Sequence, residues 1–402
     1  MNFYMKMKKV FVGLLVCCFL IPLPVKGADY NPANSEEWMQ VEYRDGAFRK
    51  TFKATVGYTD SYFSEPPTST GSLSALHKSL AHTSMVAAGA TYKRRYAIKL
   101  MKKFGFHYVY DYVHATRRDN DHVSFCLGYK RIRDFNLIAV WIKGTGLNYE
   151  WVSNFNIGKG KTHHGFALAE KELDAKICHY LQQNGIVSNL KFWITGHSRG
   201  GAVANLFAKR MTEKYSASRV YAFTFASPRV STQGVRKGYL NIVNFLNPGD
   251  FVTEVAPKKW GYRRYGKDVV LPIRSKKVMM KAFKKLTGKA YEGYTKKGKI
   301  ALVNAFVRYG GKSQEEYYER PYVRGYGYLP SPSFFFQKGI GYTLSGNYRE
   351  GLRNALKVAV FNTKAQYVLG KLFTDGMTSN KFKHAHSQSS YVLWLEASGY
   401  KY

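Results

Sequence analysis

The stretch that decides the fold is residues 192–204, which reads Phe192-Trp193-Ile194-Thr195-Gly196-His197-Ser198-Arg199-Gly200-Gly201-Ala202-Val203-Ala204. It places a Gly-x-Ser-x-Gly pentapeptide between an apolar run typical of a strand and a small-residue run typical of a helix packed on a sheet. Side chains at Gly196 and Gly200 would keep the strand and the helix apart. The pattern therefore predicts a nucleophile elbow, with Ser198 on a sharp turn formed by Gly196, His197 and Gly200.

The segments around this turn alternate between strand and helix patterns. Strands are expected at 122–131, 135–142, 190–195, 220–225 and 240–246, and helices at 165–183 and 201–214. Strands separated by helices are typical of a mostly parallel central sheet with helices on both faces, which is an α/β fold. Residues 28–120 are expected to be mainly helical, with the better segments at 73–90 and 92–104.

A serine hydroxyl is a poor nucleophile unless a histidine removes its proton and a carboxylate orients that histidine. Asp250 follows the strand expected at 240–246 and is the candidate acid, with Glu254 as the weaker alternative. After Asp250 the histidines are His384 and His386, both in a polar segment before the apolar run 391–395. We therefore expect one of these two histidines to reach Ser198.

The negative charge that develops on a carbonyl oxygen during such chemistry needs hydrogen-bond donors. One donor is expected from the backbone N–H of Arg199, directly after Ser198 and at the start of a helix. The second is expected in the loop after the strand at 135–142, where Thr145 can donate through both its N–H and its hydroxyl. These two residues form the predicted oxyanion hole.

The chain resembles the class 3 lipase family, a group of α/β hydrolases that includes secreted fungal triacylglycerol lipases. The matching segments, in the family's order, are 142–145, 150–154, 163–166, 196–201, 225–230, 247–252, and His386 with Tyr391. The family's closing His-x-x-x-x-Tyr spacing selects His386 over His384. Three residues depart from the family pattern: Arg199 stands where leucine is usual, Lys143 replaces arginine, and Thr253 replaces the common proline.

The resemblance implies an α/β-hydrolase fold and a serine carboxylic-ester hydrolase that acts on lipid esters. Its catalytic residues would be Ser198, His386 and Asp250, working through an acyl-enzyme with no metal or organic cofactor. Two alternative activities remain open, a phospholipase A-type hydrolase of anionic phospholipids and a feruloyl-type esterase. A noncatalytic polyanion-binding protein is the distant alternative.

The N-terminus has the pattern of an export signal. Residues 1–27 combine a basic start, an apolar run at 10–21 and a small-residue stretch, and they are predicted to be a cleaved signal peptide, with a lipoprotein anchor at Cys17 or Cys18 as the lesser alternative. Residues 28–402 would then be one secreted hydrolase domain, extracellular or periplasmic. A basic, aromatic-rich insertion, which would act as a cap or lid, is expected at about 258–375.

The composition is strongly basic, with 62 Lys+Arg against 26 Asp+Glu and a formal net charge of +36. An apolar fraction of 45% excludes a disordered chain. Residues 275–288 predict a basic amphipathic helix with Met279, Phe283 and Leu286 on one side, which favours an anionic membrane or lipid-droplet surface as partner. Nucleic acid is not expected, because no reader motif is present. The remaining cysteines, Cys126 and Cys178, permit one disulfide without requiring it.

Overall fold

The computed structural model describes residues 36–66, 73–111, 122–146, 154, 157, 160–309, 322–323, 327–328, 349, 352–353 and 380–401. The predicted signal peptide lies outside the described residues, as does most of the expected insertion beyond residue 309. Cys126 and Cys178 are both free thiols. In the part of the chain that the structure describes, no helix has the length and apolar character needed to span a membrane.

A seven-stranded sheet forms the centre of the molecule, with the strand order β3-β4-β5-β6-β7-β8-β9. The strands β3, β4 and β5 pair antiparallel, and all pairs from β5 to β9 are parallel. The sheet is that of an α/β-hydrolase fold, as predicted. The strand bounds are β3 (His107–Asp111), β4 (Phe125–Ile132), β5 (Phe135–Ile142), β6 (Leu190–His197), β7 (Val220–Phe225), β8 (Ile242–Leu246) and β9 (Lys267–Val270).

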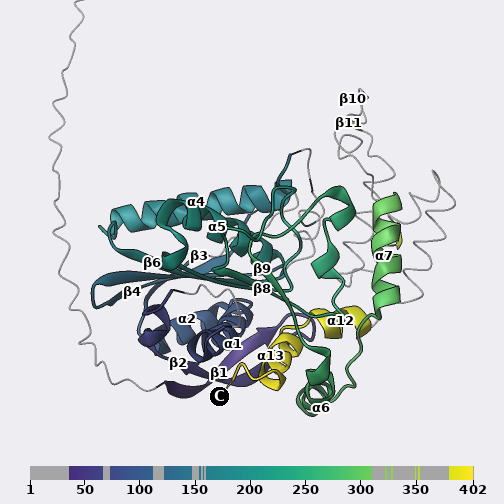
Figure 1. Ribbon diagram of the computed structural model, residues 1–402, viewed down its shortest axis with the longest axis horizontal. Coiled ribbons are helices and arrows are strands. Elements are labelled where there is room, and N and C mark those ends of the chain that lie inside the picture. Colours follow the sequence, from purple (N-terminus) through teal and green to yellow (C-terminus); the bar gives the residue numbers. More distant parts are fainter. Residues whose placement is uncertain are drawn as a thin grey trace, which may run out of the picture.

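Helices cover both faces of this sheet (Figure 1). One face carries α4 (His164–Gln183) and α5 (Arg199–Tyr215), and the other carries α1 (Ala75–Ala90), α2 (Arg94–Lys103) and α13 (Gln388–Ala397). The close approach of α5 follows from its small first residues, since Ala202, Val203 and Ala204 are fully buried. The fold thereby places the start of α5 directly after the end of β6.

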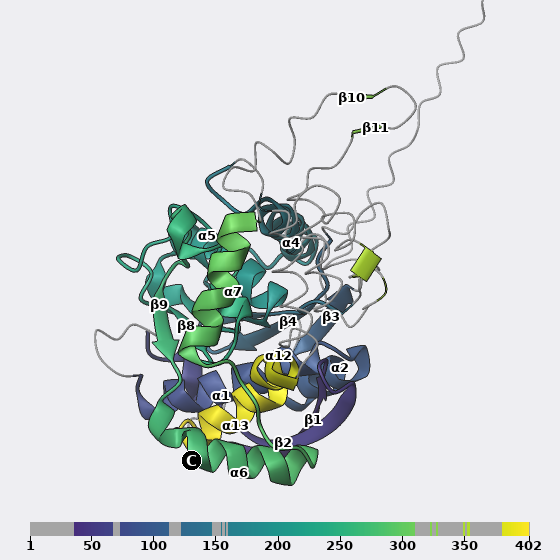
Figure 2. The ribbon, with the colours of Figure 1, turned by 90° about the vertical axis from the view of Figure 1, so that its right-hand side faces the viewer.

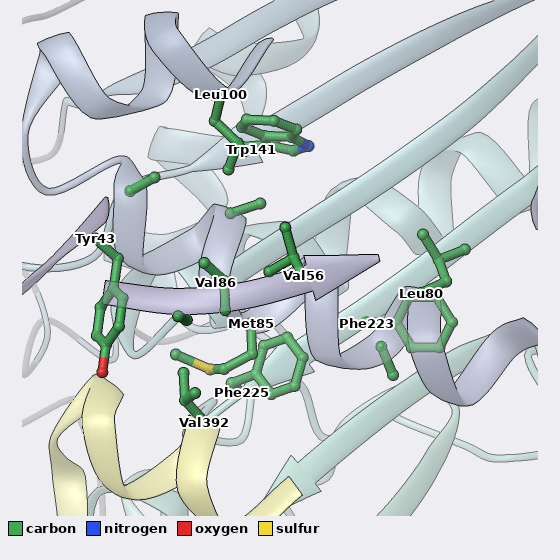
Figure 3. Close-up of a cluster of buried hydrophobic side chains, with 14 of the residues drawn as sticks. Tyr43, Val56, Leu80, Met85, Val86, Leu100, Trp141, Phe223, Phe225 and Val392 are labelled. Atoms are coloured by element: carbon green, nitrogen blue, oxygen red, sulfur yellow. The ribbon is translucent and has the colours of Figure 1, made fainter. Parts of the chain in front are cut away.

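The expectation of a mainly helical N-terminal region is wrong for residues 37–58. They form an antiparallel hairpin of β1 (Glu37–Asp45) and β2 (Lys50–Tyr58). In β1, buried residues alternate with less buried ones. This is the period of two that is typical of a strand, and it differs from helical spacing. Figure 3 shows the result, a core cluster that joins the hairpin, α1, β7 and α13 through Tyr43, Val56, Leu80, Met85, Val86, Phe223, Phe225 and Val392.

The first part of the expected insertion belongs to the hydrolase core. Strand β9 pairs with β8 at the edge of the sheet, and α6 (Lys276–Thr287) packs on α13. The next helix is α7 (Lys296–Tyr309), and α12 (Asn380–His386) returns the chain to the sheet. The remaining short elements are η1 (Asp60–Phe63), η2 (Ala217–Arg219), η3 (Val252–Glu254), η4 (Lys258–Trp260), η5 (Ile273–Ser275), β10 (Tyr322–Val323) and β11 (Gly327–Tyr328).

Candidate active site

Ser198 lies on the turn between β6 and α5 with a positive φ of 60° and a ψ of −128°. A non-glycine residue adopts this backbone conformation only when its surroundings hold it there, at a cost of about 1–3 kcal/mol. Here the Ser198 N–H donates to the Phe225 carbonyl of β7 at 2.9 Å. A Cβ on Gly200 would lie 2.4 Å from the Ile142 carbonyl oxygen, so only glycine allows α5 to start this close to β5.

The structure brings His386 and Asp250 to this serine, although both are far away in sequence. His386 Nε2 lies 2.8 Å from Ser198 Oγ, and His386 Nδ1 lies 2.9 Å from Asp250 Oδ2. Because a carboxylate only accepts hydrogen bonds, the imidazole proton belongs on Nδ1, and Nε2 is left to accept the serine proton. This is the geometry of a serine hydroxyl with a general base and an orienting acid.

The carboxylate of Asp250 is fully buried and is held by donors on both oxygens. The Val252 N–H donates to Oδ1 at 2.9 Å, and the Tyr391 hydroxyl donates to Oδ2 at 2.9 Å. Burial and the Asp250 charge raise the pKa of Tyr391 well above its ordinary value, so its hydroxyl stays protonated and remains a donor. These hydrogen bonds hold the carboxylate in a fixed orientation against His386.

The alternative acid, Glu254, is engaged elsewhere. Its carboxylate pairs with Arg229 and with Lys299, the latter at 3.1 Å. Burial alone raises the pKa of Glu254, but the two cations outweigh that effect and lower the pKa to about 2. Glu254 therefore serves in an ion cluster after β8, whereas Asp250 contacts the imidazole.

The alternative histidine, His384, lies in an aromatic cluster. Its ring centroid is 5.5 Å from that of Phe48 and 5.1 Å from that of Phe283, and its Nδ1 accepts the Glu292 N–H at 3.2 Å. Burial lowers the pKa of His384. The structure thus places His386, and not His384, beside Ser198, which agrees with the spacing of the family motif.

The two predicted oxyanion donors lie on segments that pack together. Arg199 is the first residue of α5, where backbone N–H groups have no partner within the helix. The loop that carries Thr145 lies against the elbow, because a Cβ on Gly144 would come within 2.5 Å of the His197 carbonyl oxygen. The half-buried Thr145 has its Oγ1 at 2.8 Å from Asn154 Nδ2.

Several side-chain contacts that support the site were not predicted from the sequence. The side chain of Asn247 donates to the Ala385 carbonyl at 2.7 Å and so holds the segment that carries His386. His197 Nδ1 lies 3.1 Å from the Tyr92 hydroxyl and 3.2 Å from Gln388 Nε2. Burial and the neighbouring His386 lower the pKa of His197 well below its ordinary value, so a neutral ring stands beside the imidazole. Nothing in the local sequence around Tyr92 or Gln388 marks these contacts.

Among the residues that the structure describes, no three His, Cys, Asp or Glu side chains are grouped so as to hold a metal ion.

Comparison with known proteins matches the part of the chain that carries most of this site. The family model "Lipase (class 3)" matches residues 133–260. Solved structures with similarity include the triacylglyceride lipase of Rhizomucor miehei, with 17% identity, a TM-score of 0.38, and coverage of 51% of this chain and 83% of that chain. A lipase from Rhizopus microsporus var. chinensis gives 19% identity, a TM-score of 0.36, and coverage of 51% and 78%. No curated protein sequence matches the chain.

Proposed function

We propose that this chain is a serine carboxylic-ester hydrolase that cleaves lipid esters. Ser198, His386 and Asp250 would work through an acyl-enzyme, and residues 133–260 match the class 3 lipase family. The observation that carries the proposal is the unbroken hydrogen-bond path from Asp250 Oδ2 through both ring nitrogens of His386 to Ser198 Oγ. Each link is within 2.9 Å, so the serine is activated without any movement of these three side chains.

The chemistry follows from these contacts. Ser198 Oγ attacks the ester carbonyl carbon while its proton passes to His386 Nε2, and Asp250 stabilises the imidazolium. The N–H of Arg199 and the N–H and hydroxyl of Thr145 bind the oxyanion of the tetrahedral intermediate. The alcohol leaves with the proton from Nε2, and a water molecule activated by the same nitrogen then hydrolyses the acyl-Ser198 ester and restores the free hydroxyl.

The ester class is tested with a panel of triglyceride, anionic phospholipid and aryl ester under matched conditions. We expect hydrolysis of at least one of the two lipid esters to exceed that of the aryl ester by about tenfold or more. Preference for the aryl ester would replace this proposal with the feruloyl-type activity. An intact protein that hydrolyses none of them and resists labelling by a fluorophosphonate would support the noncatalytic alternative.

We further propose that the protein is exported, on the basis of the pattern at residues 1–27. The N-terminal sequence of the exported protein would begin near residue 28, and retention of residues 1–27 would contradict the proposal.

A second proposal concerns the surface of α6, which we infer binds anionic lipid. All five lysines of α6 are exposed, at positions 276, 277, 281, 284 and 285. Two exposed apolar side chains accompany these lysines, Val278 of α6 at 61% exposure and Ile273 of the preceding η5 at 72%. Met279 and Phe283 are fully buried, so they pack the helix onto the core and are not available for insertion, contrary to the expectation from the sequence.

The position of α6 supports this interaction. Phe283 contacts His384, two residues before His386, and Figure 2 shows α6 on the same side of the molecule as α7 and α12. A cationic face with exposed apolar residues fits the interface of an anionic bilayer, where each nearby lysine adds roughly 1 kcal/mol. Binding through α6 would hold the ester substrate near Ser198.

Charge reversal on α6 tests the lipid surface. The triple variant Lys277→Glu, Lys281→Glu and Lys285→Glu is expected to lower binding to anionic vesicles by at least about tenfold at low salt, as measured by vesicle co-sedimentation. The matched control is Lys171→Glu, Lys214→Glu and Lys237→Glu, which makes the same charge change at sites away from α6. Equal binding of the unmodified protein to neutral and anionic vesicles would refute the proposal.

A further inference from the structure

The tip of the β1–β2 hairpin contacts the segment that carries His386. Asp45 is the last residue of β1, and it is fully buried. Its Oδ1 accepts the N–H groups of Ala47 at 2.9 Å and of Phe48 at 3.2 Å, within the hairpin turn. Its Oδ2 accepts the N–H of Ser389 at 2.9 Å. One carboxylate therefore shapes the hairpin turn and also binds the first turn of α13, just after His386.

Two more hydrogen bonds join the hairpin to the start of α13. The Gly46 N–H donates to Gln388 Oε1 at 2.9 Å, and the Tyr43 hydroxyl donates to Ser389 Oγ at 3.0 Å. Figure 3 shows the Tyr43 hydroxyl pointing at the yellow segment that contains α13. Gln388 and Ser389 are buried, so water does not compete for these hydrogen bonds. Residues 388–389 are thereby fixed relative to the hairpin.

The side chain of Gln388 continues this path to the nucleophile elbow. Its oxygen accepts the Gly46 N–H, so its NH₂ group donates to His197 Nδ1 at 3.2 Å. His197 directly precedes Ser198, and its ring centroid lies 4.9 Å from that of His386. One path of hydrogen bonds therefore joins the hairpin tip, the start of α13 and the elbow.

His386 stands at the junction of two helices. It is the last residue of α12, and α13 begins at Gln388. Before the junction, Asn247 holds the chain by its 2.7 Å hydrogen bond to the Ala385 carbonyl. After the junction, the hairpin tip holds residues 388–389. The placement of His386 depends on both contacts, because neither helix by itself fixes the bend between them.

We propose that Asp45 and Gln388 are positioning residues that hold His386 at hydrogen-bond distance from Ser198. The N-terminal hairpin, which lies outside the residues 133–260 that match the family model, thereby takes part in catalysis. Loss of this hold lets His386 Nε2 move relative to Ser198 Oγ, and a misplacement of about 1 Å can cost about 100-fold in rate. This inference rests on the proposed ester hydrolysis, because the step that it supports is the transfer of the Ser198 proton.

The isosteric variant Asp45→Asn tests the proposal. Two N–H groups face Oδ1, so the amide oxygen takes that place and the hairpin turn is kept. The NH₂ group then takes the place of Oδ2 and faces the Ser389 N–H, so two donors oppose each other. The Ser389 hydroxyl can rotate to accept, but the backbone N–H cannot. We expect the rate of fluorophosphonate labelling and kcat for ester hydrolysis to fall by about 10- to 100-fold, with KM nearly unchanged.

Labelling stoichiometry separates positioning from a purely structural role. The final labelled fraction counts the folded active sites, whereas the labelling rate reports how well the imidazole activates Ser198. For Asp45→Asn we expect the labelled fraction to match that of the unmodified protein while the rate falls. A structural role would instead lower the labelled fraction and leave the rate of the remaining sites unchanged, and that result would overturn the proposal.

The matched control is Asp60→Asn, which changes a carboxylate directly after the same hairpin. Asp60 accepts from Lys130 Nζ of β4 at 2.8 Å and from the Tyr58 hydroxyl at 2.9 Å. Loss of this ion pair is expected to lower the melting temperature and to leave the labelling rate unchanged, because Asp60 contacts β4 and not α13. An equally slow Asp60→Asn protein would show that any weakening of the hairpin has the same effect, and would refute the specific role of Asp45.

A second variant keeps the proposal testable if Asp45→Asn does not fold. Gln388→Met has a similar length and removes the hydrogen bonds to Gly46 and His197. It is expected to slow labelling by about tenfold, and a rate equal to that of the unmodified protein would overturn the proposal. Failure of the proposed function would leave the unmodified protein unlabelled and without esterase activity. Failure of this inference alone would leave that protein active and the Asp45→Asn protein labelled equally fast.

Discussion

Replacing Ser198 with alanine is expected to lower kcat for ester hydrolysis by about 10⁴- to 10⁶-fold and to abolish fluorophosphonate labelling. The reason is the loss of the hydroxyl oxygen that lies 2.8 Å from His386 Nε2, without which no acyl-enzyme forms. The fold should be retained, because the Ser198 N–H bond to Phe225 involves the backbone alone and alanine has the same Cβ.

The matched control for this substitution is Ser218→Ala, an exposed serine in η2 that is expected to keep full activity. Steady-state kinetics on a short-chain ester and gel detection of the labelled protein measure both effects. Substantial turnover by the Ser198→Ala protein would mean that another group is the nucleophile.

Replacing Asp250 with asparagine is expected to lower kcat by about 10⁴-fold at neutral pH. Two donors, the Val252 N–H and the Tyr391 hydroxyl, already face this carboxylate. The amide oxygen in the place of Oδ1 accepts the Val252 N–H, so the NH₂ group takes the place of Oδ2. There it faces the Tyr391 hydroxyl and His386 Nδ1, and both must become acceptors. The ring proton moves to Nε2, and that nitrogen can no longer accept the proton of Ser198.

The control for this prediction is Asp134→Asn, an exposed residue in the turn between β4 and β5, which should behave as the unmodified enzyme. The informative measurement is kcat together with KM. Loss of the correct tautomer lowers kcat but leaves substrate binding, and therefore KM, largely intact. A variant with unchanged kcat would assign the orienting role to another carboxylate.

Much of the fold was predictable because its signals are local. The bounds of β5 and β7 agree with the prediction to the residue, since both strands are buried on both faces and consist almost wholly of apolar residues. The elbow was equally readable from the spacing of Gly196, Ser198 and Gly200. The hairpin β1–β2 was not predicted, although Val41, Tyr43 and Asp45 are buried and the residues between them are less so, which is the strand period of two.

The sequence predicted which residues are candidates for the site, but it predicted less of how their side chains contact one another. Asp250 and the pair His384 and His386 followed from chain order, and the motif spacing favoured His386. The contact of Asn154 with both Thr145 and Arg199 was not foreseeable, since it depends on where three separate segments end. The burial of Phe283 was not foreseeable either. Its place in a basic amphipathic helix indicated a lipid surface, but the side chain packs in the core.

The sequence by itself determined the α/β alternation and the strained turn at Ser198, because strand periods, helix periods and glycine requirements act between neighbours in the chain. Only the tertiary structure shows that the histidine and the carboxylate reach the serine, since His386 lies 188 residues from Ser198 and 136 from Asp250 in sequence. Contacts over such separations depend on how the sheet, α12 and α13 pack together. The direction of a buried amide such as that of Asn154 depends in turn on the donors and acceptors that this packing places around it.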